Sequence, residues 1–177
     1  MTTVATAWRE AFGNARPGYD MAWQLRIHSL PQGKRYPDTE AEYLELLARH
    51  NAAATAVLGG GAACVLLVGL WSPDDLAVEQ NRLPAMAGLK FVDVPDLPSP
   101  TDPEEVEHAF HAASIKWSPG VFDSIIRDVA DEALPLIVFA NLTRRAAYKP
   151  YDGGADLICG SFERARELAA EYAEWLP

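Results

Sequence analysis

The amino-acid sequence predicts an α+β domain in which helices pack against one mainly antiparallel sheet. Apolar and polar residues alternate between positions 21 and 28, residues 63–70 are continuously apolar, and a glycine turn at 152–154 joins two short strand-like segments. Helical periodicity occurs between these segments, and the strands are concentrated late in the chain. The pattern predicts about six strands and about four helices in a single domain that spans residues 1–177.

The chain begins with an N-terminal helix or arm over residues 1–18, which we expect to dock through Trp8 and Phe12. The first strand follows at 21–28, where a period of two predicts one buried face. The apolar side chains expected on that face are Trp23, Leu25 and Ile27.

A long helix comes next and leads into the most apolar strand. Asp38 or Thr39 is expected to cap this helix, which runs to about position 58. Its predicted apolar face consists of Leu44, Leu47, Ala54 and Leu58. Glycines at 59–61 end the helix, and the strand at 63–70 is expected to be covered on both faces or central in the sheet.

The middle of the chain contains one further strand at 90–94 and then an exposed, acidic, proline-rich loop at 95–105. Residues 107–117 leave two structures open. The sequence at 101–105 has the residues of a helix start, whereas alternation in the second half of the segment favours a strand.

The last third of the chain alternates between helix and strand signals. Ser118 and Pro119 have the residue types of an N-cap and a first helical position, and an amphipathic helix is expected to follow them. A strand is predicted at 135–140, and Ser161 is expected to cap the final helix. The predicted inward stripe of that helix consists of Ala165, Leu168, Tyr172 and Trp175.

Composition limits the class of partner and the compartment. With 15 Lys and Arg against 25 Asp and Glu, the formal net charge is −10, which argues against nucleic acid and anionic membranes as partners. The longest apolar run, 59–71, is too short to span a bilayer, and no secretory signal is apparent at the N-terminus. Cys64 and Cys159 lie far apart in apolar segments, as expected for free thiols, so we expect a cytoplasmic protein.

No arrangement of residues in the sequence predicts catalysis or metal binding. The glycines at 59–61 lack the lysine of a phosphate loop and follow a helix, so they are interpreted as a helix stop. His108 and His111 have no third ligand nearby and are interpreted as surface or packing residues. We therefore predict no catalytic residue, no metal site and no cofactor, and the balance is against an enzyme.

The most specific local signal is the turn formed by Tyr151, Asp152, Gly153 and Gly154, with Asp156 shortly after it. In a binding interpretation, the tyrosine and the two aspartates face outward and accept hydrogen bonds from cationic side chains of a partner. In a structural interpretation, Asp152 caps its own turn, and Asp156 pairs across the hairpin with one of two neighbouring arginines. Those arginines are Arg144 and Arg145.

Acidic residues also recur along the final helix at spacings of four, four and three. They are Glu163, Glu167, Glu171 and Glu174. Such a stripe is typical of a solvated helix face. Together with the acidic loop at 95–105, it is alternatively a docking surface for a cationic partner.

The residues of the hairpin and of the chain end carry a resemblance. The run at 151–158, followed by Tyr172 and Trp175, resembles the C-terminal part of a family of small, functionally uncharacterised bacterial proteins. Three further segments are similar: the Trp-Ser-Pro-Gly sequence at 117–120, Arg26, and the Arg-Tyr pair at 35–36. The resemblance implies no activity. By analogy only, small acidic members of comparable gene families look like immunity partners of secreted toxins.

We therefore expect a non-enzymatic protein, immunity-like by analogy, that binds a basic protein partner through acidic and aromatic side chains. Tyr151, Asp152 and Asp156 are the expected contacts, with Trp117 as a further aromatic candidate. The alternative is a small hydrolase or transferase with a carboxylate site at Asp152 and Asp156, which predicts a deep pocket near the hairpin. In a third interpretation the turn is purely structural.

Overall fold

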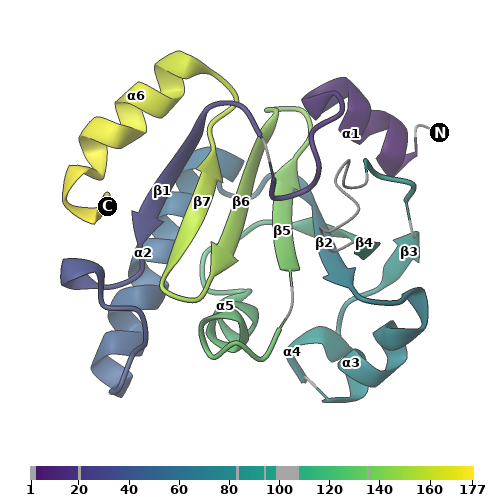
Figure 1. The fold of residues 1–177 in the computed structure, drawn as a ribbon, viewed down its shortest axis with the longest axis horizontal. Helices are drawn as coiled ribbons and strands as arrows, with labels where there is room; N and C mark the ends of the chain where they lie inside the picture. The colour runs from purple at the N-terminus through teal and green to yellow at the C-terminus, as the bar shows by residue number, and fades with distance from the viewer. Residues whose placement is uncertain (1–2, 20, 83, 94, 99–107, 135) are drawn as a thin grey trace.

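The structure, a computed structural model, describes residues 3–19, 21–82, 84–93, 95–98, 108–134 and 136–177. In these residues one seven-stranded sheet has the order β1-β7-β6-β5-β2-β4-β3 (Figure 1), and every neighbouring pair of strands is antiparallel. The strands are β1 (Gln24–His28), β2 (Ala63–Leu70), β3 (Phe91–Asp93), β4 (Ala109–Lys116), β5 (Leu136–Asn141), β6 (Ala146–Tyr151) and β7 (Gly154–Ile158). The α+β class and the antiparallel sheet predicted from the sequence are confirmed.

Helices accompany the sheet on both faces and at one edge (Figure 1). They are α1 (Val4–Phe12), α2 (Glu40–Leu58), α3 (Leu76–Arg82), α4 (Pro84–Ala87), α5 (Asp123–Ala130) and α6 (Phe162–Glu171). Single 3₁₀ turns are formed by Pro31–Gly33, Pro73–Asp75 and Ala173–Trp175. The segment expected to begin a helix at 101–105 lies outside the described residues, as does most of the acidic loop at 95–105.

The long helix α2 has the predicted boundaries. The Thr39 hydroxyl accepts a hydrogen bond from the Glu42 backbone N–H at 3.3 Å, and Gly59 ends the helix with φ +89°. One residue of the predicted apolar face is wrong, because Leu44 is exposed. The buried side is rotated toward residues that include His50, which a hydrophobic pattern does not single out.

The larger core lies between the sheet and the helices α2 and α5. Alternation along β2 sends Leu66 and Val68 to this core and Val65 and Leu67 to the opposite face. Because β2 lies between β5 and β4 and is buried on both faces, the prediction of a central strand at 63–70 is confirmed.

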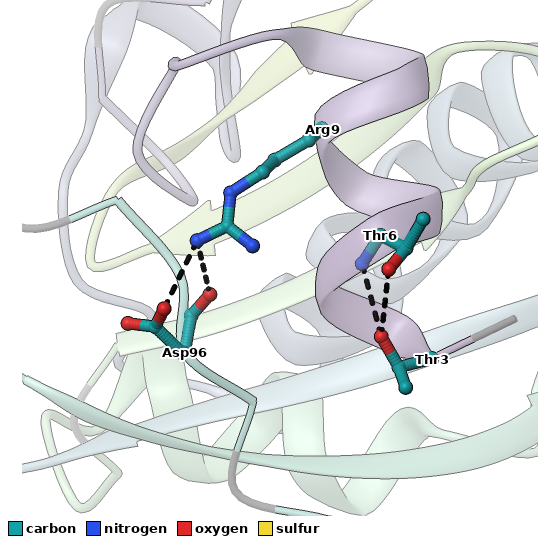
Figure 2. A network of polar contacts seen from close by, with 4 residues as sticks. All are labelled: Thr3, Thr6, Arg9 and Asp96. Atoms are coloured by element: carbon teal, nitrogen blue, oxygen red, sulfur yellow. Dashed lines mark hydrogen bonds and ion pairs between the residues drawn. The ribbon is translucent and has the colours of Figure 1, made fainter.

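A smaller core lies on the opposite face, beneath α1. Trp8 is buried there, and its indole N–H donates to the Ala15 carbonyl at 2.8 Å. Thr3 caps α1, while Arg9 reaches both the carbonyl oxygen and the carboxylate of Asp96 at 2.9 and 3.1 Å (Figure 2). In Figure 1, α1 lies toward the β5–β2 side, and none of the helices among the described residues crosses in front of β1, β7 and β6.

Two local predictions differ from the structure. Trp23 precedes β1 with φ 56° and is 49% exposed, so it does not share the buried face of the strand. Ser118 does not cap a helix, since α5 begins only at Asp123. The reason is Gly120, whose φ of +83° is incompatible with a first helical turn, and whose N–H bonds to Asn51 at 2.8 Å.

Segment 107–117, for which helix and strand were both open, is a strand over its second half, as β4 shows. It is the partner of β2 along its whole length. None of the helices in the described part of the chain is long and apolar enough to cross a membrane.

Candidate functional site

The β6–β7 hairpin turns through Asp152 and Gly153, with Tyr151 and Gly154 paired across it. Gly153 has φ +90°, a conformation that side chains with a Cβ rarely adopt. Gly154 is required for a different reason: an added Cβ would collide with the Ile27 carbonyl oxygen and lie 2.8 Å from Tyr151 Cζ. The two glycines therefore let the chain turn and let the Tyr151 ring lie directly over the strand β7.

A row of charged side chains crosses the open face of the sheet. The strand registers place Arg26 of β1 and Lys149 of β6 on either side of Asp156 of β7. Arg26 donates to both carboxylate oxygens of Asp156, from Nε at 2.8 Å and from Nη2 at 3.2 Å, and Lys149 Nζ lies 3.7 Å from Oδ2. This charged row, Arg26–Asp156–Lys149, leaves the Asp156 side chain only 3% exposed.

The pKa values of the two basic members of the charged row are shifted in opposite directions. The hydrogen bond that Arg26 donates to Asp156 raises the pKa of Arg26. Burial lowers the pKa of Lys149, and the nearby Asp156 carboxylate opposes that shift. Lys149 is covered by the loop that follows α1, where it donates to the Gly18 carbonyl at 2.8 Å and lies 4.8 Å from the centre of the Tyr19 ring.

Asp152 is held at the turn by two residues from the segment before α2. The Arg35 guanidinium forms a hydrogen-bonded ion pair with it, and the Tyr36 hydroxyl donates to Oδ2 at 3.2 Å. Arg35 also lies 4.0 Å from Glu132, and its own pKa is raised by the Asp152 hydrogen bond. Asp152 therefore joins the hairpin to a distant segment and does not merely cap its own turn.

A hollow of about 340 Å³ lies beside the hairpin, where β6 ends and β5 begins. We call it the hairpin hollow. Its walls include three aromatic rings, two carboxylates and an imidazole: Tyr19, Trp71, Tyr151, Asp152, Glu132 and His108. Trp71 is 68% exposed, and its ring lies 5.5 Å from that of His108. Burial raises the pKa of Tyr151, so its phenol stays protonated at neutral pH.

The structure separates the residues that the sequence grouped as one binding surface. Tyr151 and Asp152 line the hairpin hollow, and Gly153 and Gly154 shape its rim through the turn. Asp156 points to the same face but is enclosed by its partners, and its ion pairs are with Arg26 and Lys149, whereas the structural interpretation expected Arg144 or Arg145.

Trp117 is not available to a partner, which corrects its selection as an aromatic contact. Its side chain is 0% exposed, its indole N–H donates to the Thr55 hydroxyl at 3.0 Å, and its ring stacks on Phe122. The residue faces the larger core because it continues the alternation of Ala113 and Ile115, which face the same core, and a ring of this size supplies much apolar contact.

No role is predicted from the sequence for Arg26, Arg35 or Lys149. Arg26 and Arg35 entered only through the family resemblance, and no local pattern links them to a turn more than 100 residues later. A signal was present in β1 itself: Arg26 alternates with Leu25 and Ile27, which places it on the face opposite the larger core.

A second polar group lies on the other face of the same strands. His50 of α2 bonds through Nε2 to the Ser29 hydroxyl at 2.7 Å and through Nδ1 to the Tyr148 hydroxyl at 2.6 Å. All three side chains are buried, and burial lowers the pKa of His50 to about 3. A neutral imidazole donates with one ring nitrogen and accepts with the other, so this sealed triad, Ser29–His50–Tyr148, is satisfied but closed to a substrate.

The cysteines and acidic groups give no metal or nucleophile site in the described residues. Cys64 and Cys159 are both buried and free, and burial raises the pKa of Cys159 to about 11, which disfavours a thiolate. Across the described ranges, no three histidine, cysteine, aspartate or glutamate side chains converge as metal ligands.

The fold and this site define a single-sheet α+β protein with a polar hairpin surface on the half of the sheet that none of the helices α1 to α6 covers. The family comparison agrees with that description: residues 7–177 match a domain of unknown function, DUF3885, and the chain belongs to this family. The expected membership of an uncharacterised family is thereby confirmed. Neither the comparison with curated proteins nor that with solved structures gave a significant match.

Proposed function

We propose that this chain is a non-enzymatic protein-binding protein that receives a cationic side chain of a basic partner in the hairpin hollow. The observation that carries the proposal is the lining of the hollow, in which Asp152 and Glu132 lie beside the rings of Tyr19, Trp71 and Tyr151. Aromatic faces and carboxylates are the groups that bind Arg and Lys side chains.

Charge on the whole chain supports the same partner class. A formal net charge of −10 attracts a basic protein over a distance and raises its association rate, an effect that salt weakens. Trp71 supports a protein interface as well, because a largely exposed indole offers apolar area that a partner can bury. An immunity-like role is the more specific form of this proposal, and its support is the analogy with small acidic proteins of that class.

The incoming cation would compete with Arg35 for Asp152. The Arg35 side chain is 60% exposed, so it can swing into solvent without leaving the packed core. The ion pair joins an exposed guanidinium to a carboxylate that is 19% exposed, so solvent weakens it, and a partner arginine that is also packed on aromatic rings can replace Arg35.

The same geometry gives less support to a hydrolase or transferase at Asp152 and Asp156. A general acid or base must reach the proton that it transfers, and both oxygens of Asp156 are engaged by Arg26 behind a nearly closed surface. Asp152 is engaged by Arg35 and Tyr36. Neither carboxylate is directed at a substrate position in this arrangement.

The test is affinity capture with three forms of the immobilised chain at low and at moderate salt, with bound proteins identified by mass spectrometry. The wild type is compared with Trp71→Ser combined with Glu132→Gln. A control combines Glu163→Gln with Glu174→Gln, two exposed acids of the terminal segment that lie away from the hairpin hollow.

We expect wild type and control to retain the same basic protein, and the hollow variant to retain at least about tenfold less, which corresponds to about 1.4 kcal/mol. Circular dichroism checks that each form is folded. Equal retention by the hollow variant, or the absence of any basic protein bound to wild type at low salt, would contradict the proposal.

A further inference from the structure

A smaller hollow of about 180 Å³ lies at the opposite end of β7, between α1 and the turn that joins β5 to β6. We call it the Trp23 hollow. Its walls are mainly apolar and include Phe12, Met21, Trp23 and Arg145. Of the described residues that line this hollow, Arg145 is the one with a charged side chain.

The backbone around the Trp23 hollow adopts conformations that side chains disfavour. Trp23 has φ 56° and Arg145 has φ 54°, both in the left-handed region, and Gly160 joins them at φ +76°. For a bulky residue such as tryptophan, this conformation is an outlier. Hairpin turns commonly place a left-handed residue where Arg145 lies, but usually a glycine or an asparagine.

Close packing explains why position 160 is a glycine, but it does not explain the left-handed conformation of Trp23 and Arg145. A Cβ at Gly160 would collide with the Arg144 carbonyl oxygen, so that position requires glycine. Trp23 is half-exposed, with its ring 5.8 Å from that of the equally exposed Phe162, and Arg145 is exposed, so neither side chain fills a core. Residues that adopt an unfavourable conformation without a role in a buried core are typical of sites that serve a ligand.

The Arg145 guanidinium is also available for a ligand. No hydrogen bond or ion pair joins its side chain to another residue in the part of the chain that the structure describes, in contrast to Arg26 and Arg35. It lies between the Trp23 hollow and a second hollow of about 290 Å³, which Glu10 and Thr143 also line.

We propose that the Trp23 hollow binds a small carboxylate that carries an aromatic or apolar body. The Arg145 guanidinium would hold the carboxylate through two parallel hydrogen bonds, and the body would pack against Trp23, Met21 and Phe12. One guanidinium balances the single charge of a carboxylate, whereas a phosphate would keep unbalanced charge against apolar walls. The Trp23 hollow, at about 180 Å³, is smaller than pockets for drug-sized ligands, which begin at about 300 Å³. Its volume therefore suits a single ring with its acid group.

This site is separate from the hairpin hollow, so the two proposals can fail independently. The carboxylate could come from a free aromatic acid or from the C-terminus of a peptide, since both present the same group. Benzoate represents the first source. A short peptide ending in phenylalanine represents the second, with its C-terminal amide form as the neutral comparison.

The test is a titration of the ¹⁵N-labelled full chain, followed by NMR through the Trp23 indole and the Gly160 amide. For wild type we expect saturable shifts with benzoate or with the free-acid peptide at about 1 mM, as is typical of fragments this small. The stronger of the two ligands identifies the source. Benzamide and the amidated peptide should bind at least tenfold more weakly.

Arg145→Gly should reduce binding at least tenfold while the melting temperature does not fall, because glycine adopts this backbone conformation without strain. Trp23→Gly should also reduce binding, and Lys90→Gln, which removes an exposed charge elsewhere, should leave it unchanged. The proposal is overturned if Arg145→Gly binds as wild type does, if neutral and acidic ligands bind equally, or if no ligand gives a saturable shift.

Discussion

Two neighbouring residues of β6, Tyr148 and Lys149, belong to polar groups that differ in almost every property. Tyr148 faces the larger core and joins the sealed triad with Ser29 and His50, whereas Lys149 faces the open half of the sheet and joins the charged row. The sealed triad is neutral, and the charged row consists of ions. The difference follows from solvent access, because burying an ion costs far more than burying a hydrogen-bonded neutral group.

The comparison also separates stability from function. In the sealed triad every hydrogen bond is made where no ligand can enter, so we expect its loss to destabilise the protein and to leave no binding defect in the folded fraction. The charged row supports the hairpin, and its Lys149 lines the hairpin hollow beside Tyr151. Its loss should disturb both stability and the proposed binding.

The largest effect is expected from His50→Ala. This change leaves a cavity in the core and removes the partner of the Ser29 and Tyr148 hydroxyls, so it should lower the free energy of unfolding by about 3 kcal/mol. Urea denaturation measures it. His28→Ala, at a half-exposed position on the other face of the sheet, serves as the control and should cost less than about 1 kcal/mol.

Asp156→Ala should have the next largest effect, about 2 kcal/mol, since it leaves the partly buried Lys149 without its carboxylate. Unlike the His50 change, it should also weaken capture of the basic partner, because Lys149 and Tyr151 would no longer be held in place. Denaturation and the capture assay together test this. A loss of stability with unchanged capture would assign the charged row to the fold alone.

The dependence of stability on pH should come from the sealed triad in the range below neutrality. His50 has a pKa of about 3 when folded and an ordinary value of 6.5, so the unfolded chain binds a proton that the folded chain excludes. The stability contributed by the neutral imidazole is complete above pH 6.5 and is lost as pH falls toward 3, by about 1.4 kcal/mol per pH unit.

Urea denaturation between pH 7 and pH 5 measures this loss, which should reach about 2 kcal/mol at pH 5. In His50→Ala the same experiment should show a correspondingly smaller decrease. An unchanged pH profile in the variant would show that a different group carries the dependence.

The smallest effects on stability are expected from two tyrosines of β6, Tyr148 in the sealed triad and Tyr151 beside the charged row. Tyr148→Phe and Tyr151→Phe remove the same hydroxyl from residues three positions apart. Tyr148→Phe should cost about 1.5 kcal/mol, because it leaves a ring nitrogen of His50 without its partner in the core. Tyr151→Phe should cost less than about 0.5 kcal/mol, since the ring over Gly154 is retained. Thermal melts of both variants, each compared with wild type, decide this.

Local patterns predicted much of the fold. The apolar run at 63–70, the threonine cap of α2 and the glycine turn of the hairpin lie where expected, and the alternation predicted over 21–28 gives a strand at Gln24–His28. These features depend on neighbours within a few residues, which the sequence displays directly. The helix start predicted at Ser118 is wrong. A residue type that favours the N-cap does not start a helix when a glycine two positions later takes a positive φ.

The candidate site was predicted only in part, because the ion pairs of its arginines join residues that are far apart in the sequence. Tyr151 and Asp152 were chosen from the turn itself, which is local. Arg26 lies 130 residues before Asp156, and Arg35 lies 117 residues before Asp152, so no periodicity connects them. Trp117 was selected as an aromatic candidate for contact, but it lies just after β4 and belongs to the larger core.

The amino-acid sequence by itself determined the class of the fold, the order of most of its elements and the glycine turn at 152–154, because propensity, periodicity and turn chemistry act over short stretches of chain. The tertiary structure alone decided which charges meet across β1, β7 and β6, and which aromatic rings stay exposed. Those outcomes depend on the strand order and register, which place residues from the two ends of the chain side by side on one face.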